Sequence, residues 1–329
     1  MNKYLIFSHQ SDIDGINCVI LAKLAFLNVD YELCPNFDSL SSIFKYYLDN
    51  DLFKQYDKIY ITDLALQEPL LSIVANSNLK NKLWIFDHHQ ASINNNLNKY
   101  DFSIIVEENE NGKTCATQLF YEYLIKNSFL NENNLLKEFV ELTRLEDTWE
   151  WKKKKMKGLK AHNLAILFNA YGVDEYIFSI FNKLLKSRQK FYFTDKELNI
   201  IKDKQEEYQN ILATYFNDIL YLYDEFNNKF GILYANYEYR NEIADYIKKE
   251  KNPNNIKYIV IVAMDKGFGQ KSYRSIDNNF DVNKLTEIYG GGGHKNASSV
   301  NITKEQSEKA KTMTKEDSLK YLAKCKFIS

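Results

Sequence analysis

The residues with the clearest chemical potential are Asp87, His88 and His89, which directly follow the apolar run from Leu83 to Phe86. Two adjacent imidazoles and a carboxylate at the end of a buried strand are hard to explain by packing. Polar side chains enter a protein interior only when they are paired or bound to a metal. This triplet therefore predicts a metal-binding or catalytic site.

Further acidic and imidazole side chains occupy comparable positions in the first half of the chain. They follow the apolar runs at 4–7 and 59–61, or end the helical stretch at 136–145, and they are His9, Asp12, Asp14, Asp63 and Asp147. Open α/β sheets place their binding sites at the carboxyl ends of their strands. The shared placement therefore predicts one common site at that edge of a sheet.

A pair of divalent metal ions is the chemistry that such a set would serve. Two ions about 3.5–4 Å apart need a bridging carboxylate and further oxygen and nitrogen ligands. Asp12 and Asp14 could serve one ion each, and Asp63 on a neighbouring strand is the natural bridge. Mixed imidazole and carboxylate ligation favours Mn²⁺ over Mg²⁺. The alternative is a set of unrelated caps and ion pairs, but grouping at strand ends is typical of metal and catalytic sites.

Composition and length limit the class of protein. A chain of 329 residues favours two domains, and a net charge of −1 gives no reason to expect tight binding to long nucleic acid. Four cysteines without a CxxC pair argue against a disulfide framework or a zinc knuckle. We find no basic leader and no apolar run that approaches a membrane span. These features predict a soluble, cytoplasmic protein without a membrane partner.

The order of elements predicts an α/β fold. Strands at 3–8, 58–62, 82–86 and 102–106 alternate with helical stretches, which indicates a mainly parallel sheet flanked by helices. A polar helix at 195–216 is typical of a connector, and a smaller α/β domain follows it. We expect a catalytic domain at 1–190, a helical connector at 191–222 and a C-terminal domain at 223–329.

A second chemical motif lies in the C-terminal domain, where a glycine run is followed by His294. Backbone N–H groups of the run could approach an anion closely, since no Cβ stands in the way; they belong to Gly291, Gly292 and Gly293. Arg274, on the preceding strand, could donate two hydrogen bonds to a phosphate. The alternative is a flexible turn or a helix stop.

These motifs together resemble those of the DHH phosphoesterases. Order and spacing agree with the four motifs of that family for Ser8-His9-Gln10-Ser11-Asp12-Ile13-Asp14-Gly15, Asp63, Asp87-His88-His89 and Asp147. The stretch 290–298 resembles the GGGH motif of the DHH-associated substrate-binding domain. Many relatives have one more residue between the first His and the first Asp. The resemblance therefore supports ligation by Asp63 and His88 more strongly than ligation by His9.

The resemblance implies a role for each motif residue. One divalent ion would be held by His9, Asp12 and Asp63, and the other by Asp14, Asp63, His88 and Asp147. Asp87 would orient a metal-bound imidazole through its free N–H, and His89 would face the scissile phosphate. The terminal nucleotide would be bound in the C-terminal domain by Arg274, Gly291, Gly292, Gly293, His294 and Ser298.

A two-domain chain of this length is most similar to the short-RNA exonucleases of this family, the nano-RNases, and in particular to their B-type branch. The implied reaction is hydrolysis of short oligoribonucleotides to mononucleotides with two divalent ions, Mn²⁺ by the ligand set. Hydrolysis of adenosine 3′,5′-bisphosphate or of linear or cyclic dinucleotides stays open, as does an RNA-binding module without catalysis. A homodimer is also left open.

Two smaller motifs remain. Lys152 to Lys155 follow Trp149-Glu150-Trp151 and could meet the backbone of a short RNA while a Trp stacks on a base. A solvated basic turn is the more common meaning of such a run. The stretch 114–117 opens a helix whose N–H groups could point at a phosphate, or could simply be capped.

Overall fold

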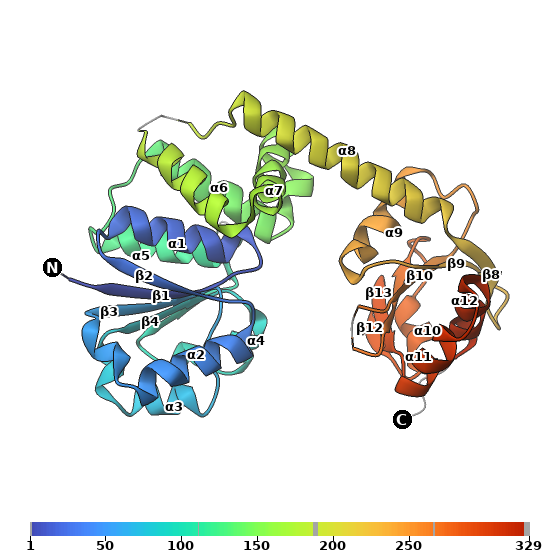
Figure 1. Cartoon of the computed structure of the whole chain (residues 1–329), viewed down its shortest axis with the longest axis horizontal. Coiled ribbons are helices and arrows are strands. Elements are labelled where there is room, and N and C mark those ends of the chain that lie inside the picture. Colours follow the sequence, from blue (N-terminus) through green and yellow to red (C-terminus); the bar gives the residue numbers. More distant parts are fainter. Residues whose placement is uncertain (1, 111, 187–189, 266, 326–329) are drawn as a thin grey trace. The chain divides into compact units, whose positions relative to one another are not determined.

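The computed structural model describes residues 2–110, 112–186, 190–265 and 267–325, with Ala91 described by its backbone only. The chain forms two compact units, Met1–Lys204 and Gln205–Ser329. The division falls within helix α8 (Asp195–Asn217). Each unit has its own sheet and its own core (Figure 1).

The first unit is built on a five-stranded sheet in which all neighbouring strands are parallel, in the order β2-β1-β3-β4-β5. The strands are β1 (Tyr4–His9), β2 (Val29–Cys34), β3 (Lys58–Thr62), β4 (Leu83–Asp87) and β5 (Ser103–Ile105). A parallel sheet flanked by helices is the α/β fold expected from the sequence, so that prediction is confirmed.

Both faces of this sheet are buried, because alternate side chains of each strand point to opposite faces. On β1, Tyr4 and Ile6 pack into one core, and Leu5 and Phe7 pack into the other. One face carries α1 (Ile13–Ala25) and α5 (Ala116–Lys126), with α6 (Asn134–Asp147) and α7 (Lys155–Leu185) beyond them (Figure 1). The other face carries α2 (Phe37–Asp49) and α3 (Leu70–Ala75).

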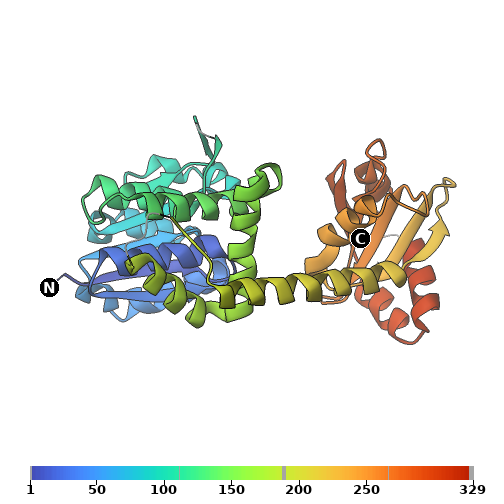
Figure 2. The same ribbon diagram turned by 90° about the horizontal axis from the view of Figure 1, so that it is seen from above.

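Short elements complete the first unit. Helix α4 (Gln90–Asn94) follows β4, and the 3-10 turns are η1 (Leu52–Gln55), η2 (Asn78–Asn81), η3 (Leu97–Lys99) and η4 (Glu150–Lys153). Two short strands, β6 (Glu108–Asn109) and β7 (Gly112–Lys113), pair as an antiparallel hairpin that projects from the unit (Figure 2). The sequence did not predict this hairpin.

Helix α7 corrects one expectation from the sequence. By length and composition it could cross a membrane, since an 18-residue window has a mean hydropathy of 1.3, with 33% of that window buried. The expectation that no apolar run approaches a membrane span was therefore wrong. Leu164, Leu167 and Ile180 nevertheless lie in the core of the first unit, and Gly172 interrupts the helix with φ 71° and ψ 177°. These are features of a core helix.

The second unit is built on a mixed six-stranded sheet in the order β12-β13-β11-β10-β9-β8. Strands β9 and β10 are parallel and the other neighbouring pairs are antiparallel. The strands are β8 (Leu220–Tyr223), β9 (Lys229–Tyr234), β10 (Tyr258–Ala263), β11 (Gln270–Ser275), β12 (Gly292–His294) and β13 (Ala297–Asn301).

Helices cover both faces of this second sheet as well. One core includes residues of α8 and of α9 (Arg240–Lys249), which follows the 3-10 turn η5 (Tyr237–Tyr239). The other core includes residues of α10 (Val282–Ile288), α11 (Lys304–Lys311) and α12 (Lys315–Lys324).

Candidate metal centre and substrate-binding residues

The turn between β1 and α1 brings the first predicted ligands together. Asp12 caps α1 by accepting hydrogen bonds from the N–H groups of Asp14 and Gly15, each at 3.1 Å. Its other carboxylate oxygen lies 2.8 Å from Nδ1 of His9. A Cβ on Gly15 would lie 2.1 Å from the carbonyl oxygen of His9. The close approach of helix to strand therefore requires glycine at that position.

Asp14 is fixed by a helix that lies a hundred residues away in the chain. Its two carboxylate oxygens accept hydrogen bonds from the N–H groups of Ala116 at 2.7 Å and Thr117 at 2.8 Å. These N–H groups open α5, where the helix dipole favours negative charge. The sequence left open whether they point at a phosphate, and the structure places them on Asp14.

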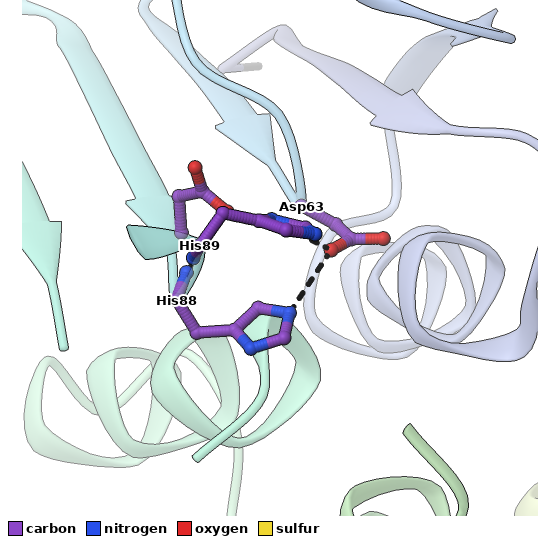
Figure 3. A group of neighbouring side chains, drawn as sticks. Asp63, His88 and His89 are labelled. Atoms are coloured by element: carbon purple, nitrogen blue, oxygen red, sulfur yellow. Dashed lines mark hydrogen bonds and ion pairs between the residues drawn. The ribbon is translucent and has the colours of Figure 1, made fainter. Parts of the chain in front are cut away.

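Asp63 lies at the centre of the candidate site. It follows β3 in a left-handed conformation with φ 58°, and it is 1% exposed. One carboxylate oxygen lies 3.3 Å from Nδ1 of His9. The other lies 3.4 Å from Nε2 of His88, as Figure 3 shows. Neither oxygen has a hydrogen-bond partner among the described residues. Asp63 therefore faces two groups of side chains at once.

The second group gathers around His88. Its Nε2 lies 3.7 Å from a carboxylate oxygen of Asp14 and 3.4 Å from one of Asp147, at the end of α6. In three groups the potential ligand atoms lie within 4.8 Å of one another: His9, Asp12, Asp63; Asp14, His88, Asp147; and Asp63, Asp87, His88, His89. The structure thus brings together all eight predicted residues of the first unit.

The donor atoms of these groups fit a metal ion. Both carboxylate oxygens of Asp63, Nε2 of His88 and one oxygen of Asp147 are buried and lack a hydrogen-bond partner among the described residues. Burial raises the pKa of the Asp63 carboxyl well above its usual range, and the charges of Asp12 and Asp14 raise it further. A cation at this place would offset both costs. The groups could therefore hold a metal ion.

The carboxylates of the site also raise the pKa values of His9 and His88. Burial lowers the pKa of His9, but Asp12 and Asp63 outweigh burial and raise that pKa to about 10. Burial also lowers the pKa of His88, and the charges of Asp14 and Asp147 outweigh it, so that this pKa is raised. At neutral pH the imidazole of His9 is therefore protonated in the metal-free protein, and metal binding there would release that proton.

Asp87 orients His89, the more exposed of the two neighbouring imidazoles. One carboxylate oxygen accepts from the N–H of His88 at 2.8 Å and lies 2.7 Å from Nδ1 of His89. The other oxygen accepts from the hydroxyl of Ser92. The family resemblance implies that Asp87 orients a metal-bound imidazole. The observed ring contact is instead with His89, whose side chain is 47% exposed. Figure 3 shows His89 beside Asp63.

The predicted residues of the second unit meet across three neighbouring strands. Arg274 of β11 pairs with Ala297 of β13, which pairs with His294 of β12. Directly paired residues point to the same face of a sheet, so the small Ala297 lies between the side chains of Arg274 and His294. Nε of Arg274 donates to Asn241 of α9 at 2.8 Å. Burial lowers the pKa of Arg274, and the charge of Arg240 lowers it further.

The glycine run has a largely structural explanation. Gly290 ends α10 with φ 76°. A Cβ on Gly291 would lie 2.1 Å from a carbonyl oxygen of β13, and one on Gly293 would lie 2.6 Å from another. Gly292 is exposed, and a Cβ there would meet no atom within 4 Å. Gly291 and Gly293 are thus needed for strand packing, and Gly292 is open to a ligand.

Some contacts could not be found by sequence reasoning. Ser298 is 4% exposed, and its hydroxyl donates to the carbonyl of Val282 at 3.0 Å, so its side chain positions α10. Ser92 and Asn241 hold Asp87 and Arg274, respectively, and neither stands in a recognisable motif. Only the fold brings these residues to their partners.

Comparison with known proteins adds a relative that spans most of the chain. No family model matches the chain. Oligoribonuclease NrnB of Bacillus subtilis (strain 168) is 33% identical over 311 residues, which are 93% of this chain and 74% of that protein. The chain belongs to the NrnB family of DHH phosphoesterases. The resemblance found in the motifs is thereby confirmed.

Solved structures agree with the NrnB family fold. The DHH domain of a protein described as a member of a family of ribosomal proteins matches with a TM-score of 0.58 at 14% identity, covering 99% of this chain and 88% of that chain. A pGpG-specific phosphodiesterase from Vibrio cholerae matches with a TM-score of 0.50 at 15% identity, covering 94% and 97%. At these identities the likeness concerns the fold.

Proposed function

We propose that this protein is a metal-dependent phosphoesterase that hydrolyses short oligoribonucleotides to mononucleotides. The observation that carries the proposal is the position of Asp63, whose two carboxylate oxygens each face a different group of buried imidazole and carboxylate donors. A pure binding module would gain nothing from burying so many carboxylates at one place. Membership of the family of an oligoribonuclease supports the choice of substrate.

We assign the metal ligands in two sets that share Asp63. One divalent ion would be bound by His9, Asp12 and Asp63, and a second by Asp14, Asp63, His88 and Asp147. The mixture of nitrogen and oxygen donors favours Mn²⁺. When bound, two such ions supply the positive charge that stabilises a phosphoryl group during in-line displacement.

The remaining side chains of the first unit position the phosphate. Asp87 holds Nδ1 of His89, so the ring presents Nε2 to the substrate. Asp87 raises the pKa of His89, which favours the doubly protonated imidazolium, and in that form Nε2 would donate a hydrogen bond to an oxygen of the scissile phosphate. Ser92 keeps Asp87 in place for this task.

The second unit would bind a nucleotide of the same substrate. Arg274 and His294 flank Ala297 on one face of the sheet, where the guanidinium group and the imidazole would both bind a phosphate group. Gly292 leaves its backbone open to a ligand, with neighbouring Gly291 and Gly293 holding the strand. We propose as domains a catalytic part at 1–190, a connector at 191–222 and a substrate-binding part at 223–329, and we place the enzyme in the cytoplasm.

A length series of RNA tests the proposal. The protein with Mn²⁺ is incubated with end-labelled RNAs of two to about 24 nucleotides and, separately, with adenosine 3′,5′-bisphosphate, and the products are resolved over time. We expect dinucleotides to about pentanucleotides to be cut faster than 24-mers, with a shallow salt dependence because few phosphates lose counterions. Protein with Asp63→Asn, purified identically, controls for contaminating nucleases.

Three other outcomes would replace this function. Processive degradation of long strands with a steep salt dependence would indicate a long-strand exonuclease. Faster phosphate release from the bisphosphate than mononucleotide release from any RNA would make the small nucleotide the substrate. Binding of short RNA without release of product at any metal concentration would leave a binding module.

A further inference from the structure

An exposed tryptophan in a left-handed conformation follows the candidate metal ligand Asp147 by two residues. Trp149 has φ 60° and ψ 11°, and 52% of its surface is exposed. Residues with a Cβ adopt this region at a cost, and helices that end in this way normally use glycine or asparagine. A large indole in both an unfavourable backbone region and solvent is hard to explain by stability alone.

The turn that carries this indole is held on one side by ionic contacts. Arg144 is 8% exposed and lies 3.0 Å from a carboxylate oxygen of Glu150 and 2.8 Å from one of Glu141. The N–H of Trp149 donates to the carbonyl of Glu146 at 3.0 Å. The indole is therefore presented by a turn whose backbone is fixed.

Stacking holds the other side of the turn. The ring of Trp151 lies on the ring of His162, with centroids 4.0 Å apart and planes 8° apart. Nδ1 of His162 lies 3.2 Å from a carboxylate oxygen of Glu146. A Cβ on Gly158 would lie 1.9 Å from the carbonyl oxygen of Trp151, so glycine permits this close approach. Trp151 thus serves the structure, which leaves Trp149 as the exposed ring of the pair.

One ammonium group lies over the exposed ring, and three further lysines follow it in the chain. Nζ of Lys152 lies 4.8 Å from the ring centre of Trp149 and 5.6 Å from that of Trp151. Lys153, Lys154 and Lys155 follow and are exposed. An aromatic surface beside ammonium groups is the arrangement that binds single-stranded nucleic acid, in which a base stacks while its phosphate meets a cation.

We propose that Trp149 and the lysines at 152–155 form a base-stacking subsite for the oligonucleotide that the neighbouring metal centre hydrolyses. The inference rests on the proposed function and adds a determinant of affinity to it. Trp149 stacks on a base of the substrate, and the ammonium groups bind the adjoining phosphate. Stacking is tolerant of sequence, so the subsite favours purines over pyrimidines only through stronger stacking.

Steady-state kinetics on a short adenylate RNA with Mn²⁺ provide the first test. Trp149→Ala should raise KM about tenfold, which corresponds to the loss of a stacking contact of about 1.4 kcal/mol, and should leave kcat unchanged. Trp149→Phe should recover most of the affinity, since a phenyl ring also stacks. Phe178→Ala, which removes another exposed aromatic ring of the same unit, should change neither constant. An equal KM for Trp149→Ala and the unchanged protein would overturn the subsite.

Tryptophan fluorescence provides a test that does not require hydrolysis. With EDTA present, a short adenylate RNA should quench the emission of the unchanged protein, and Trp149→Phe should lose that quenching. Quenching without hydrolysis in Mn²⁺ would refute the proposed function while keeping the subsite. Hydrolysis with identical quenching in both proteins, or with none in either, would refute the subsite alone. Quenching by anionic lipid vesicles but not by RNA would show that Trp149 and its lysines bind a membrane surface. That result would also overturn the base-stacking subsite.

Discussion

The metal centre of the first unit and the glycine run of the second unit differ in how their polar groups are used. At the metal centre, buried donor atoms of Asp63, His88 and Asp147 have no hydrogen-bond partner among the described residues. In the glycine run, Gly291 and Gly293 serve strand packing, and His294 is exposed to solvent. Buried polar atoms without hydrogen-bond partners cost free energy that a bound ligand can offset, whereas exposed polar groups form hydrogen bonds with water.

The contrast separates catalysis from affinity in this molecule. The first unit places its carboxylates rigidly, with helix caps and amide contacts that hold Asp12 and Asp14. The second unit carries Arg274 and His294 on one sheet face, where we propose that they bind a phosphate. Substitutions of the candidate metal ligands should therefore change kcat, and substitutions of Arg274 or His294 should change KM.

The largest effect is expected for Asp63→Asn. The substitution removes the carboxylate that faces both groups, and the loss of charge stabilisation by the metal should lower kcat at least about a thousandfold. Circular dichroism should show an unchanged fold, since Asp63 makes no hydrogen bond through its side chain with the described residues. If the activity of Asp63→Asn stayed within about tenfold of that of the unchanged enzyme, the metal centre would not be the part of the molecule that determines kcat.

Arg274→Ala should give the next largest effect, and mainly on KM. Loss of a charge-assisted contact of about 1.5–3 kcal/mol raises KM for a dinucleotide roughly ten- to a hundredfold. Metal content should stay at the level of the unchanged protein, because Arg274 lies on β11 of the second unit. Arg274→Lys should recover only part of the affinity, since an ammonium group cannot fork onto a phosphate. A fall in kcat without a change in KM would contradict the assignment.

Two neighbouring glycines sharpen the comparison within the second unit. A Cβ at Gly291 would lie 2.1 Å from a backbone carbonyl oxygen, whereas one at Gly292 would meet no atom within 4 Å. Gly291→Ala should therefore lower the free energy of unfolding by about 2 kcal/mol, and Gly292→Ala should leave it almost unchanged. Urea denaturation of both variants measures the difference. Equal loss of stability would show that the run is not held by packing against β13.

The smallest effect concerns the pH dependence of stability in the metal-free protein. The raised pKa values of Asp63 and Asp147 mean that the folded state binds protons more tightly than the unfolded state, so its stability falls as pH rises. The raised pKa values of His9 and His88 act in the same direction: their stabilisation is present below the unfolded pKa of about 6.5 and is lost as pH rises through the folded pKa.

Thermal unfolding in EDTA should therefore give a lower Tm at about pH 9 than at about pH 6. Asp63→Asn should flatten this dependence and raise the Tm at the higher pH, because a buried, repelled carboxylate is gone. A Tm that rises with pH in the metal-free protein would contradict this balance of charges.

Much of the first unit could be predicted from the sequence, because its apolar runs mark buried strands and its acidic residues follow them directly. Asp63 and Asp87-His88-His89 are found in this way. The amide contacts of Asp14 could not be predicted, since they come from Ala116 and Thr117 on another helix. The same holds for the ring that Asp87 contacts, because two adjacent histidines leave the choice to the geometry of the turn.

The second unit was harder to predict because the same residue type serves two purposes there. A run of glycines indicates close approach of something to the backbone, and the sequence does not say whether that is a ligand or a strand. The fold assigns Gly291 and Gly293 to strand packing and leaves Gly292 open. Ser298 likewise belongs to a substrate-binding motif by resemblance, and its hydroxyl is bonded to Val282.

Counting bound metal tests most directly whether Asp63 joins two metal-binding groups. The purified protein and Asp63→Asn are each dialysed against Mn²⁺, freed of excess metal, and measured by mass spectrometry of the elements. The unchanged protein should retain two ions per chain and the variant fewer than one, because both groups lose a shared ligand. Two ions in the variant, or none in the unchanged protein, would contradict this role of Asp63.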